Sequence, residues 1–215
     1  MSKTQKKRVA YRAARFFCGY LWVVVKRNKY GIMLLKTGLL SILCCLLLGL
    51  ATAAARPPRT IIYLVRHGEK DLTPGLADPG LTPAGEARAQ LLAKQLARRH
   101  PAALFTTDTR RTRATLTPLA QATGLTPEAY SAKEPAALAS RLGQQYAGKT
   151  VVVVGHSNTL LPLLAALGVA PLPGEIRDEE YNYLFKVTLR QGQPAKLIMS
   201  RYGAAPQSVS TNTMR

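Results

Sequence analysis

The sequence predicts an α/β protein: a three-layer α/β/α sandwich with a mostly parallel central sheet and an antiparallel edge strand. Two continuous apolar runs, "IIYLV" (61–65) and the "VVVV" within 150–157, are typical of strands buried on both faces, as in parallel sheets. Helical patterns lie between such runs, which favours alternating strands and helices. Near the C-terminus, apolar segments 183–189 and 195–202 flank "RQGQP", whose Gly192 indicates a hairpin.

The first helix is predicted over residues 81–100. Thr82 is expected to cap it, and Pro83 is expected to take the first helical position, where a backbone N–H has no helical partner. The apolar residues keep the period of about 3.6 residues that a helix packed on a sheet requires: Ala84, Ala87, Leu91, Leu92 and Leu96. We therefore expect this helix to cover one face of the sheet.

Four more segments complete the predicted sandwich: a short strand at 103–107 and helices over 108–124, 136–148 and 158–168. The helix over 108–124 is expected to begin at Asp108, a common N-cap residue, and to end at Gly124, a common C-cap residue. Strands and helices thus alternate until the final hairpin.

Residues 1–55 form a basic N-terminal extension with ten Lys or Arg and no Asp or Glu. It ends in an apolar run at 39–50 followed by small residues, which matches a signal peptide, and we expect cleavage after Ala55. The alternative is an uncleaved anchor over 31–55 in the inner membrane. In both cases the positive residues stay cytoplasmic, so the domain at 56–215 is expected to be exported, periplasmic or extracellular.

Met33 begins "MLLKTGLLSILCC", which is a complete signal-peptide pattern by itself, so Met33 is an alternative true start. All three cysteines precede residue 56, namely Cys18, Cys44 and Cys45. A domain without cysteine suits an oxidising compartment and is expected to rely on its packed core rather than on disulfides.

The formal net charge of +19 suggests a nucleic-acid partner until its distribution is considered. Residues 56–215 hold 20 of the 30 basic residues and all 11 acidic ones, without a basic helix interleaved with aromatic residues. We therefore predict no nucleic-acid partner, and membrane contact only through the extension. The oligomeric state cannot be predicted from these patterns.

Three loops leave predicted strands with polar or charged residues: "RHGEK" (66–70), "TTDTRR" (106–111) and "GHSN" (155–158). Ligands of open α/β sheets bind beyond the carboxyl ends of the strands, where such loops meet. Two of the three histidines, His67 and His156, fall in these loops. A serine hydrolase is excluded because "VGHSN" lacks the second glycine of the G-x-S-x-G elbow.

Arg66 lies next to His67, and a like charge lowers the pKa of an imidazole. Neutral His67 is suited to act as a nucleophile, and the planar Arg66 guanidinium is suited to bind phosphate oxygens. Gly68 allows a tight backbone bend near an anion. The pattern indicates phosphoryl chemistry.

These motifs resemble the histidine phosphatase superfamily, also called the phosphoglycerate-mutase-like family. "LVRHGEK" (64–70) is similar to its signature, "LFTTDTRRTRATLTPLA" (104–120) to its strand-to-helix segment, and "VVVVGHSNTLLPLLAALG" (151–168) to the motif of its second histidine. The resemblance covers about 57–202 and identifies 56–215 as a catalytic domain, that of a small, single-domain, exported member.

The resemblance implies that His67 attacks phosphorus and forms a phosphohistidine that water then hydrolyses. It also implies that Arg66, Arg111 and His156 bind the phosphoryl oxygens together with His67, and that no metal or other cofactor takes part. Arg110 and Arg113 are expected to point elsewhere. The implied substrate is a small phosphorylated molecule.

The resemblance to the larger mutase branch of the family suggests Glu134 as the general acid that protonates the leaving group. Glu134 is equally suited to open a helix ahead of Pro135. Glu128 is the second candidate, and Glu69 and Asp71 stay open. Glu179, Glu180 and Tyr181, within "IRDEEYNYLF" (176–185), are expected to lie in a solvated loop before the final hairpin; the alternative is that they border the pocket.

The predicted function is therefore a phosphoric monoester hydrolase of the histidine phosphatase type. Two alternatives stay open: a phosphatase that removes phosphate from phosphohistidine in proteins, and a catalytically weak protein that binds phosphorylated ligands. A mutase is disfavoured because the loops between the motifs are short.

Overall fold

The computed structural model describes residues 57–172 and 174–205. The chain divides between Arg56 and Pro57, so that the second unit comprises Pro57–Arg215. The predicted extension, signal peptide and anchor lie outside the described residues. Within those described ranges, no helix combines the length and apolar character needed to cross a membrane.

The second unit contains one sheet of six strands in the order β3-β2-β4-β1-β5-β6. The strands are β1 (Arg59–Arg66), β2 (Ala103–Thr106), β3 (Glu128–Ala129), β4 (Thr150–Gly155), β5 (Tyr183–Arg190) and β6 (Gln193–Arg201). The first four strands in this order, from β3 to β1, pair in parallel, whereas β5 and β6 are antiparallel. The prediction of a mostly parallel sheet with an antiparallel edge is confirmed.

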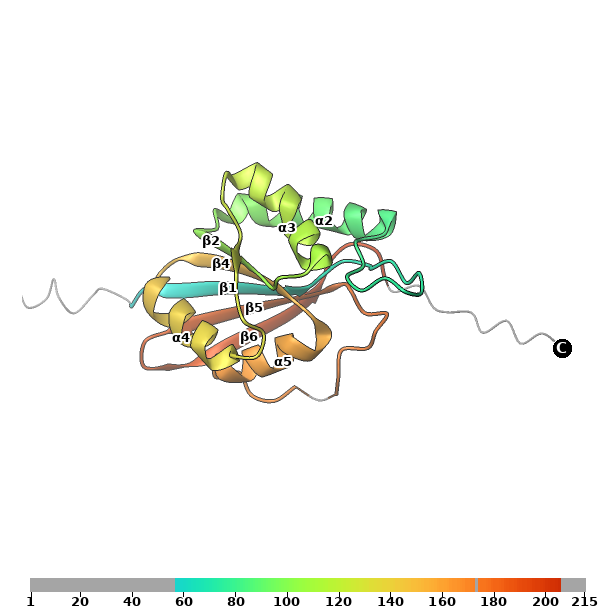
Figure 1. The fold of residues 1–215 in the computed structure, drawn as a ribbon. Helices are drawn as coiled ribbons and strands as arrows, with labels where there is room; N and C mark the ends of the chain where they lie inside the picture. The colour runs from blue at the N-terminus through green and yellow to red at the C-terminus, as the bar shows by residue number, and fades with distance from the viewer. Residues whose placement is uncertain (1–56, 173, 206–215) are drawn as a thin grey trace, which may run out of the picture. The chain divides into compact units, whose positions relative to one another are not determined.

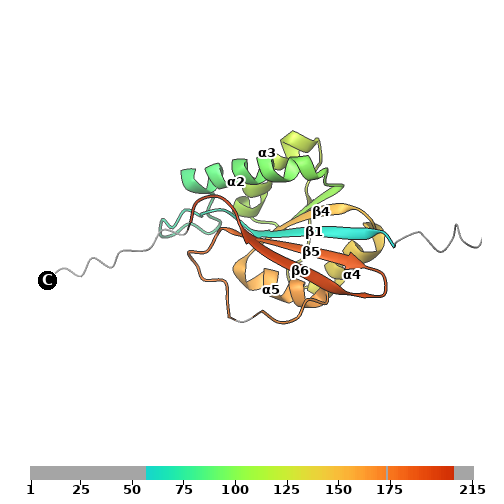
Figure 2. The same cartoon turned by 180° about the vertical axis from the view of Figure 1, so that it is seen from behind.

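Two helices cover each face of the sheet (Figures 1 and 2). They are α2 (Pro83–Leu96) and α3 (Arg110–Thr123) on one face, and α4 (Pro135–Gln145) and α5 (Ser157–Ala166) on the other. Residues alternate along β1 accordingly: Ile62 and Leu64 pack with α4 and α5, whereas Tyr63 and Val65 pack with α2 and α3. The continuous apolar pattern of β1 therefore reflects burial on both faces, as predicted.

The predicted first helix is confirmed, with Thr82 as its N-cap: Oγ1 of Thr82 accepts a hydrogen bond from the N–H of Gly85 at 3.2 Å. The α-helix ends at Leu96, and a 3₁₀ turn, Ala97–Arg99, follows it. The hairpin between β5 and β6 is also confirmed, and Gly192 has the positive φ of 72° that its turn requires.

Two local predictions need correction. Helix α3 begins at Arg110 rather than at Asp108, because Thr109 is still extended and Asp108 forms an exposed ion pair with Arg113. Strand β3 was not predicted, because two residues make no apolar pattern; it forms through backbone pairing with β2.

Candidate active site

The nucleophile candidate and the second histidine lie side by side because of strand register. Parallel β1 and β4 pair Arg66 with Gly155, so the next residues, His67 and His156, leave the same edge of the sheet. The N–H of His67 donates to the carbonyl oxygen of Gly155 at 3.0 Å, and the two imidazole centroids are 5.2 Å apart. Two residues distant in sequence thus form one site.

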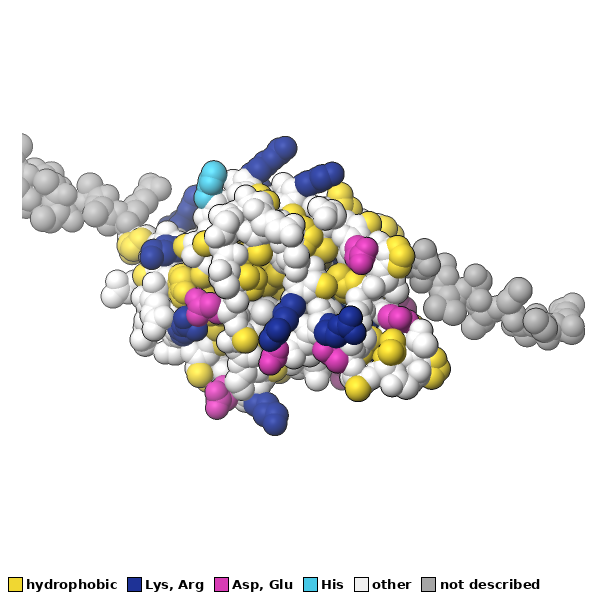
Figure 3. Space-filling view, turned by 45° about the horizontal axis from the view of Figure 1, so that its top comes forward, with side chains coloured by type: hydrophobic (Ala, Val, Ile, Leu, Met, Phe, Trp, Pro, Cys, Tyr) yellow, Lys and Arg dark blue, Asp and Glu magenta, His cyan; other side chains and the backbone are white. Residues whose placement is uncertain are grey.

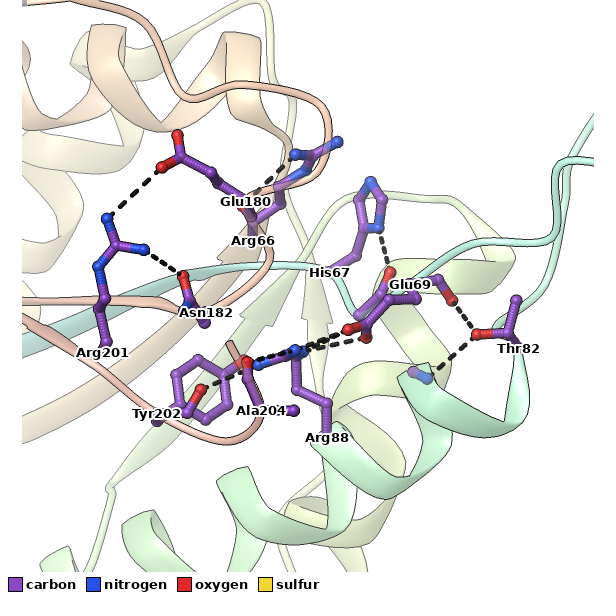
Figure 4. Close-up of polar contacts among 12 residues, drawn as sticks. Arg66, His67, Glu69, Thr82, Arg88, Glu180, Asn182, Arg201, Tyr202 and Ala204 are labelled. Atoms are coloured by element: carbon purple, nitrogen blue, oxygen red, sulfur yellow. Dashed lines mark hydrogen bonds and ion pairs between the residues drawn. The ribbon is translucent and has the colours of Figure 1, made fainter. Parts of the chain in front are cut away.

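The tautomer of His67 is defined by its backbone. Nδ1 of His67 lies 2.7 Å from the carbonyl oxygen of Gly68, which only accepts hydrogen bonds, so Nδ1 carries the proton. Nε2 of the neutral ring therefore keeps its lone pair, as an attacking nitrogen must. Figure 4 shows this contact beside Arg66.

His67 is buried, with 3 % of its surface exposed, and its pKa is lowered to about 3. Burial is the largest cause; the hydrogen bond to Gly68 acts in the opposite direction, and the charge of Arg66 adds to the lowering. The hypothesis that Arg66 keeps His67 neutral is therefore correct in direction, but burial contributes more.

Arg66 is itself buried and is held by the loop before β5. Nη1 of Arg66 donates to the carbonyl oxygens of Arg177 at 2.8 Å and Asp178 at 2.9 Å. The ring of Tyr181 covers the guanidinium, with its centroid 4.3 Å from Cζ, and lies 5.9 Å from the ring of His67. Nε of Arg66 is buried without a hydrogen-bond partner among the described residues.

Arg111 lies in the first turn of α3, where its charge lowers the pKa of both His67 and His156. Nη1 of Arg111 lies 3.4 Å from Oδ1 of Asp78, which comes from the loop between β1 and α2. Nε of Arg111 is also buried with no partner in the part of the chain that the structure describes. The Nε–H groups of both arginines are thus buried without a hydrogen-bond partner among the described residues, which is uncommon for buried polar groups.

His156 is held by Thr107, the residue that follows β2. Nε2 of His156 and Oγ1 of Thr107 share a hydrogen bond of 2.8 Å. The pKa of His156 is lowered to about 4, first by burial and then by the charges of Arg111, Arg66 and Lys70. Both imidazoles are therefore neutral at pH 7 in the free protein.

The loop after β1 packs against two helices. The N–H of Gly68 donates to Oγ1 of Thr115 in α3 at 3.0 Å. A Cβ atom at Gly68 would lie 2.8 Å from the carbonyl oxygen of Gly85 in α2, closer than such contacts allow. Glycine is therefore required at position 68 for the close approach of helix and loop, rather than for an unusual φ angle.

No hydrogen bond joins Glu134, Glu128 or Asp71 to a phosphate-binding candidate among the described residues. Glu134 is exposed, at the N-terminus of α4, and its carboxylate makes no hydrogen bond to another described residue. Glu128 pairs with Arg141 at 2.5 Å. The Asp71 carboxylate accepts hydrogen bonds from Thr73. The assignment of Glu134 stays a prediction.

Glu69, the remaining acid candidate, is held by a buried arginine. Its carboxylate accepts from Nε and Nη2 of Arg88, with distances between 2.6 and 3.1 Å (Figure 4). Burial is the largest single cause and raises the pKa of Glu69. The hydrogen bonds and the charge of Arg88 together outweigh it and hold the pKa below its ordinary value. Glu69 is therefore ionised, and its carboxylate is bound by Arg88.

Of the two expectations for residues 179–181, the solvated loop is wrong for Glu180, which is buried, whereas Tyr181 lies beside the candidate site as the alternative stated. Glu180 is 4 % exposed and accepts hydrogen bonds from the N–H of Arg177 and the hydroxyl of Tyr183, each at 3.1 Å. Tyr181 contacts Arg66 and faces His67. The acidic composition of the segment concealed this packing, because its contacts depend on the tertiary fold. Asp78 was not predicted as a site residue, because its contacts with Arg110 and Arg111 also depend on the tertiary fold.

Residues 62–132 match the model of the histidine phosphatase superfamily (branch 1), a range that includes Arg66, His67 and Arg111. None of the curated proteins matches the sequence.

Several solved structures share the fold. A mycobacterial glucosyl-3-phosphoglycerate phosphatase is 17 % identical with a TM-score of 0.55, covering 68 % of this chain and all of that one. Its VO3 complex is 18 % identical with a TM-score of 0.54, covering 70 % of this chain and all of that one. The protein histidine phosphatase SixA with tungstate is 18 % identical with a TM-score of 0.55, covering 66 % of this chain and 96 % of SixA.

The family match covers the first two motifs, and the fold brings the third, at His156, against them. Residues 62–132, about a third of the chain, are thus similar to the histidine phosphatase superfamily (branch 1), and the described domain shares its fold with solved phosphatases.

Proposed function

We propose that the protein is a metal-independent phosphatase that hydrolyses phosphomonoesters through a phosphohistidine on His67. The observation that carries this proposal is the state of His67: buried, neutral, protonated on Nδ1 and placed beside His156. A neutral imidazole whose Nε2 lone pair is free is ready to attack phosphorus.

The groups around His67 supply the charge that a phosphoryl transition state requires. Arg66 and Arg111 each keep a buried Nε–H without a partner among the described residues, which supports binding of the equatorial oxygens. A phosphoryl dianion beside His156 would favour its protonated form and add a third donor. Two fixed guanidinium groups supply the charge without a metal ion. VO3 and tungstate bind to the similar phosphatases, and phosphate is an oxyanion of the same kind.

Basic and acidic side chains are interspersed on the face drawn in Figure 3. Such a surface differs from the continuous basic stripe of nucleic-acid-binding proteins, which supports a small phosphorylated substrate as the partner.

The test is hydrolysis of 4-nitrophenyl phosphate by the purified full-length chain with and without a chelator. We expect turnover that the chelator leaves unchanged and that His67→Gln abolishes. Full loss on chelation would contradict metal independence. Normal turnover by the variant would contradict the role of His67.

A panel of phosphorylated metabolites and phosphohistidine peptides separates the phosphomonoesterase from the two alternative functions. We expect esters to be turned over. Turnover of phosphohistidine alone would favour the protein phosphatase, and tight vanadate binding without turnover would favour a binding protein.

We also propose that the domain acts outside the cytoplasm, because the basic extension and apolar run at 1–55 form an export signal. N-terminal sequencing of protein recovered from the periplasm is expected to begin at Arg56. An intact N-terminus in the membrane fraction would indicate the anchored alternative.

A further inference from the structure

Asp78 is a carboxylate that contacts the candidate phosphate site from a loop distant in sequence. It lies between β1 and α2, and its side chain reaches the start of α3. Oδ2 of Asp78 accepts from the N–H of Arg110 at 3.0 Å, and Oδ1 lies 3.4 Å from Nη1 of Arg111. Asp78 thus lies next to the guanidinium to which we assign phosphoryl oxygens.

The position of Asp78 differs from that of the other carboxylates near the site. The negative charge of Asp78 also acts on His156, whose pKa it raises against the larger effects that lower it. Asp178 contacts Arg66 at 3.4 Å, but its side chain is 96 % exposed, whereas that of Asp78 is 43 % exposed. Glu69 is engaged by Arg88. Asp78 is therefore a partly shielded carboxylate. It lies beside Arg111, whose Nε–H has no hydrogen-bond partner among the described residues.

A phosphoryl dianion bound to Arg111 would bring a second negative charge to the Asp78 carboxylate. Two anions that share one cation repel each other, and a proton between them relieves the repulsion. Substrate binding would thereby favour a proton between the Asp78 carboxylate and the phosphoryl group bound to Arg111.

We propose that Asp78 is the proton donor to the leaving group and the proton acceptor from the water that follows. This inference rests on the proposed phosphohistidine mechanism. It gives to Asp78, in the loop between β1 and α2, the role of general acid for which the sequence suggested Glu134.

The two steps balance. In the first, Nε2 of His67 forms a bond to phosphorus, the bond from phosphorus to the ester oxygen breaks, and the proton of Asp78 passes to that oxygen, giving an alcohol. In the second, water attacks phosphorus and gives a proton to the Asp78 carboxylate. The N–P bond then breaks, its electron pair returns to His67, and phosphate leaves.

The test compares kcat/KM of the full-length chain and Asp78→Asn on 4-nitrophenyl phosphate and phenyl phosphate. Asparagine keeps an oxygen that accepts from Arg110 but has no acidic proton. Because nitrophenolate leaves without help, we expect a loss of less than about tenfold on the nitrophenyl ester and about 100-fold or more on phenyl phosphate. The ratio of the two values does not depend on how much of the variant is folded.

Asp178→Asn is the matched control, because Asp178 contacts the other arginine of the site. We expect it to change both esters by the same factor. An equal loss on both esters in Asp78→Asn would overturn the inference and leave Asp78 as a helix cap. Selective loss of phenyl phosphate hydrolysis in Glu134→Gln, without such loss in Asp78→Asn, would also overturn it and assign the acid to Glu134.

Failure of the proposed function has a different signature. If wild-type protein hydrolyses neither ester, or if His67→Gln retains activity, the phosphohistidine mechanism fails and the inference fails with it. If His67→Gln is inactive and Asp78→Asn shows no leaving-group dependence, only the inference fails.

Discussion

The N–H of Gly68 donates to Oγ1 of Thr115 at 3.0 Å, and the same hydroxyl donates to the carbonyl oxygen of Arg111 at 2.7 Å. Thr115 is completely buried. One side chain therefore joins the backbone next to the nucleophile to the helical turn that carries the phosphate-binding arginine. The relative placement of His67 and Arg111 depends on this pair of hydrogen bonds.

Replacing Thr115 with valine is expected to lower kcat for 4-nitrophenyl phosphate about 10- to 100-fold, since displacements of about 1 Å have effects of this size. The lost hydrogen bond should also lower the free energy of unfolding by about 1–3 kcal/mol. Thr115→Ser keeps the hydroxyl and should restore kcat. The matched control is Thr117→Val, which removes an exposed hydroxyl bonded to Arg113. Equal effects at positions 115 and 117 would refute the positioning role.

Replacing Arg88 with methionine is expected to lower the free energy of unfolding by about 3–5 kcal/mol. Arg88 is 3 % exposed, pairs with Glu69 and also donates to the carbonyl oxygens of Tyr202 and Ala204. Its loss would leave the Glu69 carboxylate and two carbonyl groups without their donor. Urea unfolding measures the change. The comparison is Arg113→Met, which breaks the exposed pair with Asp108 and should cost less than about 1 kcal/mol.

Acid is expected to destabilise the fold through the two histidines. The pKa of His67 is lowered to about 3 and that of His156 to about 4, from 6.5. Below pH 6.5 the unfolded chain therefore binds protons that the folded protein does not, so stability falls as pH falls toward 4. For His67 alone, the free energy of unfolding falls by up to about 1.4 kcal/mol for each pH unit. Urea unfolding between pH 7 and 4 should show a shallower slope in His67→Gln, and an unchanged slope would contradict the account.

Tyr181 is expected to act through its ring rather than its hydroxyl. The ring covers the Arg66 guanidinium at 4.3 Å, whereas no hydrogen bond joins the hydroxyl to another described residue. Tyr181→Phe should therefore keep both kcat and KM. Tyr181→Ala removes the contact with Arg66 and should lower kcat/KM about tenfold, a size typical of one cation–π contact. Loss of activity in the phenylalanine variant would indicate a role for the hydroxyl instead.

The central strands and the three motifs were predictable because their signals are local. Strands buried on both faces, such as β1 and β4, need continuous apolar runs, and their ends bring His67 and His156 together through register alone. The placement of Arg66 and His67 follows directly from the end of β1.

The parts that escaped prediction depend on contacts between distant segments. The N-terminus of α3 has no local side-chain cap. The carboxylate of Asp78, 32 residues earlier in the chain, accepts the hydrogen bond from the N–H of Arg110 instead. Likewise, the sequence left open whether Tyr181 and Glu180 lie in a solvated loop or border the site, because the answer depends on how the loop packs against Arg66. The extent to which burial lowers the pKa of His67 is also a property of the packed site.

Direct trapping of the phosphorylated intermediate tests the central claim. Full-length protein is mixed with 4-nitrophenyl phosphate, quenched at alkaline pH, where phosphohistidine survives, and digested for mass spectrometry. The account predicts a phosphoryl group on the peptide that contains His67, and its absence from His67→Gln. Turnover with the phosphoryl group on another residue would contradict the account.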